Sequence, residues 1–372
     1  MPNWLRNVEE VFAVLDGAIP ELPRLLEAAE GQALYVVGGT VRDLMLGRGR
    51  TDLDVAVEGD AAAIARRLGG EVTEHGRFGT AKVRLHGTHI DLAATRAEVY
   101  TAPGALPEVR PAGIEEDLAR RDFTVNAMAL ALGDEPRLID PHGGRDDLRE
   151  GVLRALHPDS LRDDPTRALR GARYAARFGL VPDPETERQL RETDLATISK
   201  DRRRAEMERI ADEPDFSDAL NLLSEWGLLE VPPERLALAE KVAELLAAPP
   251  WSAVLSREHA IGAALEEPGE LVARLIAASP ARPSEGVELA RGASPHDLAL
   301  ARASGAAWLD DYVREWRSVV LEIGGRDLLE AGVEAGPRVG EALGETLRRK
   351  LDGQVSGREE ELRTALELAR GS

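Results

Sequence analysis

Asp52 and Asp54 stand two residues apart in a short segment, a spacing that suits metal binding. Residues 51–57 alternate apolar side chains with these acids, which predicts a strand with two faces. Residues two apart in a strand share a face, so both carboxylates point the same way with backbones about 7 Å apart. Such carboxylates can hold two Mg²⁺ ions against substrate phosphates and support an in-line displacement. An ordinary solvated strand face is the alternative.

A third acid, Asp91, stands in the segment 82–95, which reads as a hairpin with a turn near His86 and Gly87. Apolar residues flank it on both sides. We predict that Asp91 joins the aspartate pair as a third catalytic carboxylate from a neighbouring strand. A surface acid satisfied by another side chain is the alternative.

Gly38 and Gly39 lie between an apolar run at 33–37 and a helical pattern at 40–46, which predicts a strand, a turn and a helix. Glycines let a backbone approach phosphates, and free N–H groups at the start of a helix attract anions. Arg42 adds a forked cation suited to phosphate oxygens. We therefore predict a triphosphate cradle at this turn, with a tight structural turn as the alternative.

The segment 120–129 places Arg121, Asp122 and Asn126 among apolar residues that belong in a core. Its arginines could bind a triphosphate, and Asp122 could accept a hydrogen bond from a ribose hydroxyl. Because an Arg–Asp pair is often only a structural bridge, the residue types leave both interpretations open.

Asp164 and Arg167 are three residues apart in a helical pattern at 161–179, so they lie near each other on one turn. Cytosine and adenine each present an amino donor beside a ring-nitrogen acceptor, a pattern that guanine and uracil lack. A carboxylate beside a guanidinium matches it, so this pair could select C and A without a template. Alternatively, Asp164 is a helix N-cap and Pro165 the first helical residue.

The net charge of −20 counts against nucleic-acid binding unless cations gather locally. Four arginines recur at spacings of three and four and therefore form one stripe on the same helix: Arg167, Arg170, Arg173 and Arg177. Three more arginines follow at 202–204. We predict that the stripe contacts phosphates or bases, with a solvated helix face as the alternative.

A small mixed sheet must position these side chains, because strand and helix patterns alternate up to about residue 147 and helical patterns dominate beyond it. The predicted fold is therefore an α+β head followed by an all-α region. No apolar run approaches the roughly 20 residues of a membrane helix. The chain has no cysteine, which excludes disulfides and a cysteine nucleophile. We expect a cytoplasmic protein with no membrane association, and nothing implies a protein partner.

Together these motifs resemble the class II tRNA nucleotidyltransferase and bacterial poly(A) polymerase family, within the polymerase-β-like superfamily. The matching segments span about residues 33–210 in the family's order: GGTVRDLMLG, TDLDVAV, FGTAKV, HIDLAA, EEDLARRDFTVNAMA, DDPTRALRGARYAARFG and RRRAE. The resemblance implies a polymerase-β-like palm in a head at 1–146 and a helical neck for nucleobase recognition at 147–215. It also implies a helical body and tail that bind tRNA at 216–372.

The resemblance further implies a reaction in which C and A are added to the 3′ end of tRNA from CTP and ATP. The RNA 3′-hydroxyl would be the nucleophile, pyrophosphate would leave, and Asp52 and Asp54 would bind two Mg²⁺ ions. The residues that would contact, position or read the nucleotide are Gly38, Gly39, Arg42, Arg121, Asp122, Asn126, Asp164, Arg167, Arg170 and Arg173.

Two features depart from the family pattern. The base-reading motif more often begins Glu-Asp, whereas this chain has Asp163 and Asp164. The segment 97–116 differs from the stretch common in full CCA-adding enzymes, where it is held to govern the switch from C to A. It is more like that of members that add only CC, add only A or carry extra domains, so which nucleotides are added stays open.

Two other functions are the alternatives. A bacterial poly(A) polymerase usually carries a basic tail, and the last residues here, TALELARGS, form none. A non-catalytic RNA-binding homologue would be expected to have lost the metal pair, whereas both Asp52 and Asp54 are present.

Overall fold

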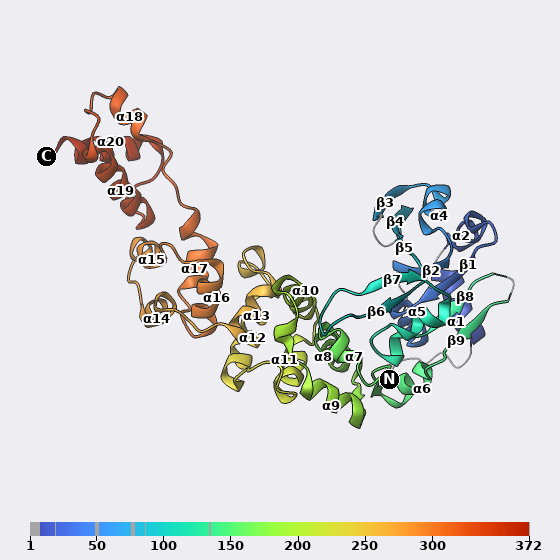
Figure 1. The fold of residues 1–372 in the computed structure, drawn as a ribbon. Helices are drawn as coiled ribbons and strands as arrows, with labels where there is room; N and C mark the ends of the chain where they lie inside the picture. The colour runs from blue at the N-terminus through green and yellow to red at the C-terminus, as the bar shows by residue number, and fades with distance from the viewer. Residues whose placement is uncertain are drawn as a thin grey trace. The chain divides into compact units, whose positions relative to one another are not determined.

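The structure is a computed structural model, and it describes residues 8–18, 20–48, 52–75, 79–85, 87–133 and 135–371. Within the second of the strands below, the side chain of Asp52 lies outside the described part. The chain forms two compact units, Met1–Leu229 and Glu230–Ser372 (Figure 1). The predicted head and neck both fall in the first unit, and the finer division at residues 146 and 215 stays a prediction.

A seven-stranded mixed sheet forms the core of the N-terminal part of the first unit (Figure 1). In spatial order its strands are β3 (Glu71–His75), β4 (Thr80–Leu85), β5 (Thr88–Ala94), β2 (Asp52–Glu58), β1 (Ala33–Val37), β8 (Ala129–Ala131) and β9 (Arg137–Ile139). The β2–β5 pair is parallel and the other neighbouring pairs are antiparallel. This sheet, followed by helices, confirms the predicted fold class.

The central strand β2 has the two faces that the sequence predicts. Leu53, Val55 and Val57 are at most 1% exposed, whereas Asp54 lies on the opposite, partly exposed face. Strands pair along both edges of β2, β1 on one side and β5 on the other. Asp54 is aligned with Asp91 of β5, whereas the pairing with β1 ends one residue away, at Val55.

Helices surround the sheet and then continue to the end of the first unit. They are α1 (Val8–Ala18), α2 (Leu22–Ala29), α3 (Gly39–Met45), α4 (Ala61–Leu68), α5 (Ile114–Ala119), α6 (Gly144–Glu150), α7 (Ser160–Asp163), α8 (Thr166–Phe178), α9 (Pro184–Glu192), α10 (Lys200–Ala211) and α11 (Phe216–Glu225).

The helix predicted at 161–179 was wrong in its continuity, because it is interrupted between α7 and α8. Asp164 is extended, with φ −134° and ψ 92°. The ring of Pro165 disfavours the helical conformation in the residue before it and removes one N–H donor. The break places Asp164 at the junction of the two helices.

The segment 97–116, noted above only as divergent, contains a hairpin of β6 (Arg96–Val99) and β7 (Glu108–Pro111). Its tip is attached to the helical part of the same unit through Gly104. The amide of Gly104 donates to the carbonyl of Asp163 at 3.1 Å, and its carbonyl accepts from Arg202 Nη1 at 2.9 Å. A short parallel pair, β10 (Val152–Leu153) and β11 (Val181–Pro182), was also not predicted.

The second unit is helical in its described part. Its helices are α12 (Pro233–Leu245), α13 (Arg257–Leu265), α14 (Glu270–Ala277), α15 (Pro283–Leu289), α16 (Pro295–Ala303), α17 (Leu309–Arg314), α18 (Gly325–Glu330), α19 (Pro337–Leu351) and α20 (Arg358–Arg370). The last three pack around buried Leu328, Ala342 and Ala365. Across all the described residues of the chain, no helix is long and apolar enough to cross a membrane.

Candidate active site

A pocket of about 950 Å³ opens in the first unit between the end of β1, the β6–β7 hairpin and α8. It is lined by Asp54 and by all ten residues that the sequence predicts to contact, position or read a nucleotide: Gly38, Gly39, Arg42, Arg121, Asp122, Asn126, Asp164, Arg167, Arg170 and Arg173. Asp91 lines a second pocket of about 480 Å³, which also includes Asp54. Segments far apart in the sequence therefore meet beside Asp54.

The glycine turn lies directly against Arg121. Gly38 has a positive φ of 66°, and a Cβ atom there would lie 2.5 Å from Arg121 Nη1. Arg121 donates through Nη2 to Asp117 at 3.0 Å and through Nη1 to the Asn126 carbonyl at 3.5 Å. Only glycine combines this backbone conformation with so close an approach of the guanidinium.

Buried Asp117 holds both arginines of the 120–121 pair. Its Oδ1 accepts from Arg120 at 2.8 Å and from the Arg96 amide at 3.2 Å, while Oδ2 accepts from Arg121. Burial alone would raise the pKa of Asp117, but Arg121 and Arg120 lower it below its usual value. Asp117 therefore stays ionised and fixes the guanidinium of Arg121 beside the glycine turn.

Asp54 is oriented by Thr40 of α3. The Thr40 hydroxyl donates to Asp54 Oδ2 at 3.1 Å, and the Asp54 amide donates back to the same hydroxyl at 3.3 Å. Asp91 is the register partner of Asp54 on β5, and its Oδ2 accepts from Lys82 Nζ at 2.9 Å. Asp91 is thus brought next to Asp54, but it is engaged by a lysine.

The donor set at this edge of the sheet is compatible with Mg²⁺. Asp52 stands two residues before Asp54 on the same strand, although its side chain lies outside the described residues. Among the side chains that are described, no three His, Cys, Asp or Glu residues gather into a metal cage. Mg²⁺ is commonly held by one or two carboxylates together with substrate phosphates, so a two-aspartate site needs no such cage.

Arg42 is buried at 3% exposure and already has protein partners. Its guanidinium donates to Asp43 Oδ1 and to Asn126 Oδ1, and it stacks over the Phe178 ring with 4.2 Å to the centroid. It also lies 5.3 Å from the Tyr174 ring centroid. Arg42 therefore connects α3 to α8 as well as lining the pocket.

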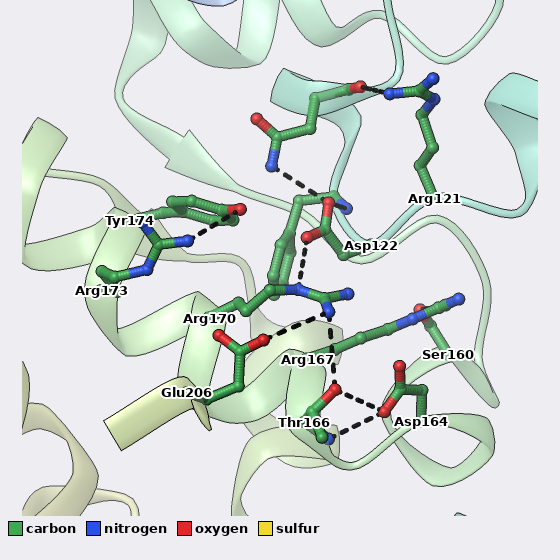
Figure 2. Close-up of polar contacts among 12 residues, drawn as sticks. Arg121, Asp122, Ser160, Asp164, Thr166, Arg167, Arg170, Arg173, Tyr174 and Glu206 are labelled. Atoms are coloured by element: carbon green, nitrogen blue, oxygen red, sulfur yellow. Dashed lines mark hydrogen bonds and ion pairs between the residues drawn. The ribbon is translucent and has the colours of Figure 1, made fainter. Parts of the chain in front are cut away.

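A chain of polar contacts continues from Arg42 to α8, and Figure 2 draws the part of it between Asp122 and Arg170. Asn126 accepts from Arg42 and donates through Nδ2 to Asp122 Oδ1 at 3.0 Å. Asp122 Oδ1 also accepts from the amide of Phe123 at 2.8 Å, and Oδ2 accepts from Arg170 Nε at 3.0 Å. Burial alone would raise the pKa of Asp122, but Arg170 and Asn126 lower it below its usual value. Asp122 is therefore a buried carboxylate held in its ionised form.

Asp164 lies at the opposite end of the pocket lining. Its Oδ1 accepts from the Thr166 amide at 3.0 Å, from the Thr166 hydroxyl at 2.6 Å and from Arg202 Nη2 at 2.7 Å. Asp164 thus caps the first turn of α8, in agreement with the capping alternative, while remaining part of the pocket. Structural and functional interpretations of this residue are compatible.

Arg167 is 2% exposed and fixed from three sides. It donates to Ser160 Oγ at 2.6 Å, to the Arg120 carbonyl at 2.7 Å and to the Tyr100 hydroxyl at 3.5 Å. Burial raises the pKa of Tyr100 to about 12 against the opposing effect of Arg167. The phenol therefore stays protonated at neutral pH and accepts from Arg167.

Three of the four arginines in the predicted stripe are paired with acids, and the fourth, Arg167, donates to neutral acceptors. Arg173 and Arg177 both pair with Glu213 Oε1, at 3.1 and 3.2 Å, and Arg170 pairs with Asp122. Even so, the buried Nε atoms of Arg121, Arg167 and Arg173 have no hydrogen-bond partner among the described residues. Buried donors without partners are costly, so this pocket favours a ligand rich in acceptors.

Sequence reasoning missed the contribution of the β6–β7 hairpin to this pocket. Arg96, Glu98 and Tyr100 line it from β6 and the residue that follows, and Leu106 lies near the hairpin tip. Short alternation in Arg-Ala-Glu-Val, directly after the predicted hairpin, is the only local signal for a further strand.

Comparison with known proteins identifies the family. Residues 34–154 match the family model described as the poly A polymerase head domain. Over 349 residues the chain is 33% identical to a CC-adding tRNA nucleotidyltransferase of Deinococcus radiodurans, covering 90% of this chain and 88% of that protein. This chain belongs to the tRNA nucleotidyltransferase and poly(A) polymerase family. An A-adding tRNA nucleotidyltransferase of Halalkalibacterium halodurans is 43% identical over 195 residues, or 49% of this chain.

The chain spans less than half the length of three A-adding members of this family that it matches: 46%, 27% and 45%. A solved structure of a CCA-adding enzyme in apo form II is similar, with a TM-score of 0.80 and 27% identity, covering 96% of this chain and 98% of that one. The Thermotoga maritima CCA-adding enzyme complexed with tRNA-CCA is similar with a TM-score of 0.71 and 26% identity over the same shares of each chain.

Proposed function

We propose that this chain is a template-independent tRNA nucleotidyltransferase that adds C, A or both to the 3′ end of tRNA from CTP and ATP and releases pyrophosphate. The observation that carries the proposal is the single pocket in which candidates for binding phosphate, ribose and base meet beside Asp54. Membership of the family supports it, since named members are A-adding, CC-adding or CCA-adding.

The triphosphate binds at the glycine turn. The backbone of Gly38 and Gly39 lies at the pocket wall, and Arg121 is held against it by Asp117. Arg121 lines the pocket, and its guanidinium suits the oxygens of a phosphate. Arg42 serves here mainly by fixing Asn126.

Asp52 and Asp54 hold the metal ions, with Thr40 orienting Asp54. When bound, Mg²⁺ lowers the pKa of the attacking hydroxyl and neutralises charge that develops on the triphosphate. Asp91 is the third carboxylate of the site. The side chains of Asp91 and Lys82 are both partly exposed to solvent, so their ion pair is weak. Lys82 can therefore leave Asp91 when RNA binds.

Asp122 positions the ribose. Among the described residues, two donors reach its Oδ1 and only Arg170 reaches its Oδ2, so Oδ2 has capacity for a further donor such as a sugar hydroxyl. The ionised state, which the lowered pKa ensures, keeps this carboxylate an acceptor throughout the neutral range.

Asp164 and Arg167 read the base, with Arg170 and Arg173 assisting from the next turns of α8. The carboxylate accepts from the amino group of cytosine or adenine, and the guanidinium donates to the ring nitrogen beside it. The 3′-hydroxyl of the acceptor RNA attacks the α-phosphate, so its oxygen forms the new bond while the bond to pyrophosphate breaks. The second pocket, which shares Asp54, provides room for the RNA end.

The test is an incorporation assay with purified protein, Mg²⁺ and tRNAs that lack the whole CCA end, lack only the final A or are complete. Each is incubated with CTP, ATP or both. We expect C, A or CCA to be added to the incomplete tRNAs and nothing to the complete one. Long A tails on unrelated RNA would favour a poly(A) polymerase instead, and no incorporation into any RNA would refute the proposal.

A further inference from the structure

The two carboxylate oxygens of Asp164 are used unequally. Oδ1 accepts all three of its hydrogen bonds, two from Thr166 and one from Arg202 (Figure 2 draws the Thr166 pair). Within the described part of the chain, no hydrogen bond reaches Oδ2. The carboxylate is therefore fixed in rotation, with one oxygen left for a ligand in the pocket that Asp164 lines.

Thr166 supplies most of this fixation although it does not line the pocket itself. The residue is buried at 4% exposure, and its hydroxyl donates to Asp164 Oδ1 at 2.6 Å. The same hydroxyl accepts from Arg170 Nη1 at 3.5 Å, a long contact that favours directing the hydroxyl proton toward Asp164. A short hydrogen bond to a carboxylate is among the stronger ones in proteins.

Arg170 connects this pair to the other end of the nucleotide site. Through Nε it donates to Asp122 Oδ2, the candidate ribose acceptor, and through Nη1 it reaches Thr166 (Figure 2). The Thr166 hydroxyl thus lies between the candidate sugar-binding acid and the candidate base-reading acid. A substitution at Thr166 would first change the orientation of the Asp164 carboxylate, which accepts its hydrogen bond.

We propose that Thr166 is a specificity-determining positioning residue, whose hydroxyl orients Asp164 so that Oδ2 faces the incoming base. The proposal rests on the proposed function of Asp164 as a base reader. It assigns a role to a residue that touches neither the nucleotide nor the RNA.

The chemistry of the bases makes orientation decisive. An oxygen held at a fixed point accepts the amino N–H of cytosine or adenine, whereas uracil presents a carbonyl oxygen at the same place and is repelled. If the Asp164 carboxylate can rotate, it loses the hydrogen bond to the amino group of cytosine or adenine. It also loses part of the repulsion of the uracil carbonyl. Selectivity for C and A over U should therefore fall more than the rate of transfer itself.

The experiment compares Thr166→Val with Thr166→Ser. Valine has nearly the same shape but no hydroxyl, whereas serine keeps the hydroxyl. For the nucleotide that the wild type incorporates, we expect Thr166→Val to lower kcat/KM roughly tenfold, mainly through KM, because one hydrogen bond to a charged group is lost. With UTP, the change in kcat/KM of Thr166→Val should be small. The kcat/KM of Thr166→Ser should stay within about threefold of the wild-type value.

Thr186→Val is the matched control. Thr186 is buried at 1% exposure, and its hydroxyl accepts from the amide of Ala155 at 2.8 Å, away from the pocket. Its loss should lower the melting temperature without changing the ratio of CTP to UTP use. Thr166→Val should change the ratio of CTP to UTP use, even if its melting temperature equals that of Thr186→Val.

A second test asks whether Thr166 acts through Asp164. In an Asp164→Ala background, the further change Thr166→Val should have little additional effect on selectivity, since the carboxylate it orients is gone. Wild-type selectivity in Thr166→Val, an equal loss in Thr166→Ser, or full additivity with Asp164→Ala would each overturn the inference while leaving nucleotidyl transfer intact. A wild-type chain that transfers no nucleotide would overturn the proposed function, and the inference with it.

Discussion

At the level of single residues, the pocket depends on side chains that are held by other side chains. Asp117 fixes Arg121, Thr40 fixes Asp54, and Asn126 connects Arg42 to Asp122. Fixed groups of this kind bind and orient a substrate without reorganising, which is what a template-independent reader requires.

The buried pair of Asp122 and Arg170 gives a prediction for stability and its pH dependence. Replacing Asp122 by Asn should cost about 3 kcal/mol at pH 7, because Arg170 loses its closest carboxylate. The pKa of Asp122 is lowered in the folded chain, so its stabilisation is complete above the unfolded value of about 3.9 and is lost as pH falls through the lowered value.

Urea unfolding of the wild type and Asp122→Asn at pH 7 and near pH 3 checks this prediction. The difference between their unfolding free energies should be largest at pH 7 and should narrow below about pH 4. A difference that grows as the solution is acidified would contradict the ion-pair account.

Gly38→Ala tests the close approach of Arg121. The positive φ of 66° costs an alanine about 1 kcal/mol, and the new Cβ would displace the Arg121 guanidinium. We expect the KM for CTP or ATP to rise about tenfold or more, since a charged contact to phosphate is lost. Gly69→Ala is the control, because it carries a similar φ of 72° with no atom near its added Cβ. An equal rise in KM for Gly38→Ala and Gly69→Ala would show that backbone strain alone, and not displacement of Arg121, is responsible.

At the level of elements, the sequence predicted those that carry strong patterns and missed those held by distant contacts. The apolar run at 33–37 and the alternation around Asp54 were sufficient to predict β1 and β2. Hairpin β6–β7 was missed because its strands are short and its tip is fixed by Gly104 contacts to residues far along the chain. The helical pattern at 161–179 did not show the break before α8, whereas the capping alternative for Asp164 and Pro165 did place a helix start there.

The same distinction applies to the candidate site. Residues in recognisable motifs, such as Gly39, Asp122 and Arg167, could be predicted to share one pocket. The contacts of Thr40 with Asp54 and of Thr166 with Asp164 were not predicted, because the sequence analysis assigned no role to either hydroxyl. The pairing of Asp91 with Lys82 follows from strand register, which the sequence alone did not fix.

Gly104→Ala tests the attachment of the hairpin. The positive φ of 70° is strained for alanine, and its Cβ would lie 2.6 Å from the backbone carbonyl of Thr197, so the tip must shift. We expect faster amide hydrogen exchange across 96–111 and weaker CTP binding, because Tyr100 and Leu106 line the pocket from this hairpin. Unchanged exchange in that segment would show that the tip is not held at Gly104. Gly133→Ala, with φ 109° and open space around it, is the control.

At the level of the whole molecule, the proposed function requires a chain with a net charge of −20 to bind two polyanions, a nucleotide and a tRNA. Several of its arginines line one pocket, and some of them, such as Arg170 and Arg173, are paired with acids, so the local field is shaped by paired groups as well as by net charge. In the proposed function, catalysis depends on Asp54, which lines that pocket, and on Asp52 of the same strand.

We propose that Asp52 and Asp54 support metal-dependent nucleotidyl transfer to tRNA, and substitution of either aspartate tests this. Single-turnover incorporation from CTP or ATP into tRNA lacking its CCA end is compared between the wild type, Asp52→Ala and Asp54→Asn, each with Mg²⁺ and with chelator, alongside tRNA binding. We predict transfer by the wild type only with Mg²⁺ and a loss of roughly a thousandfold in each variant, with tRNA binding nearly unchanged. Substantial transfer by either variant, or by the wild type in chelator, would contradict the account.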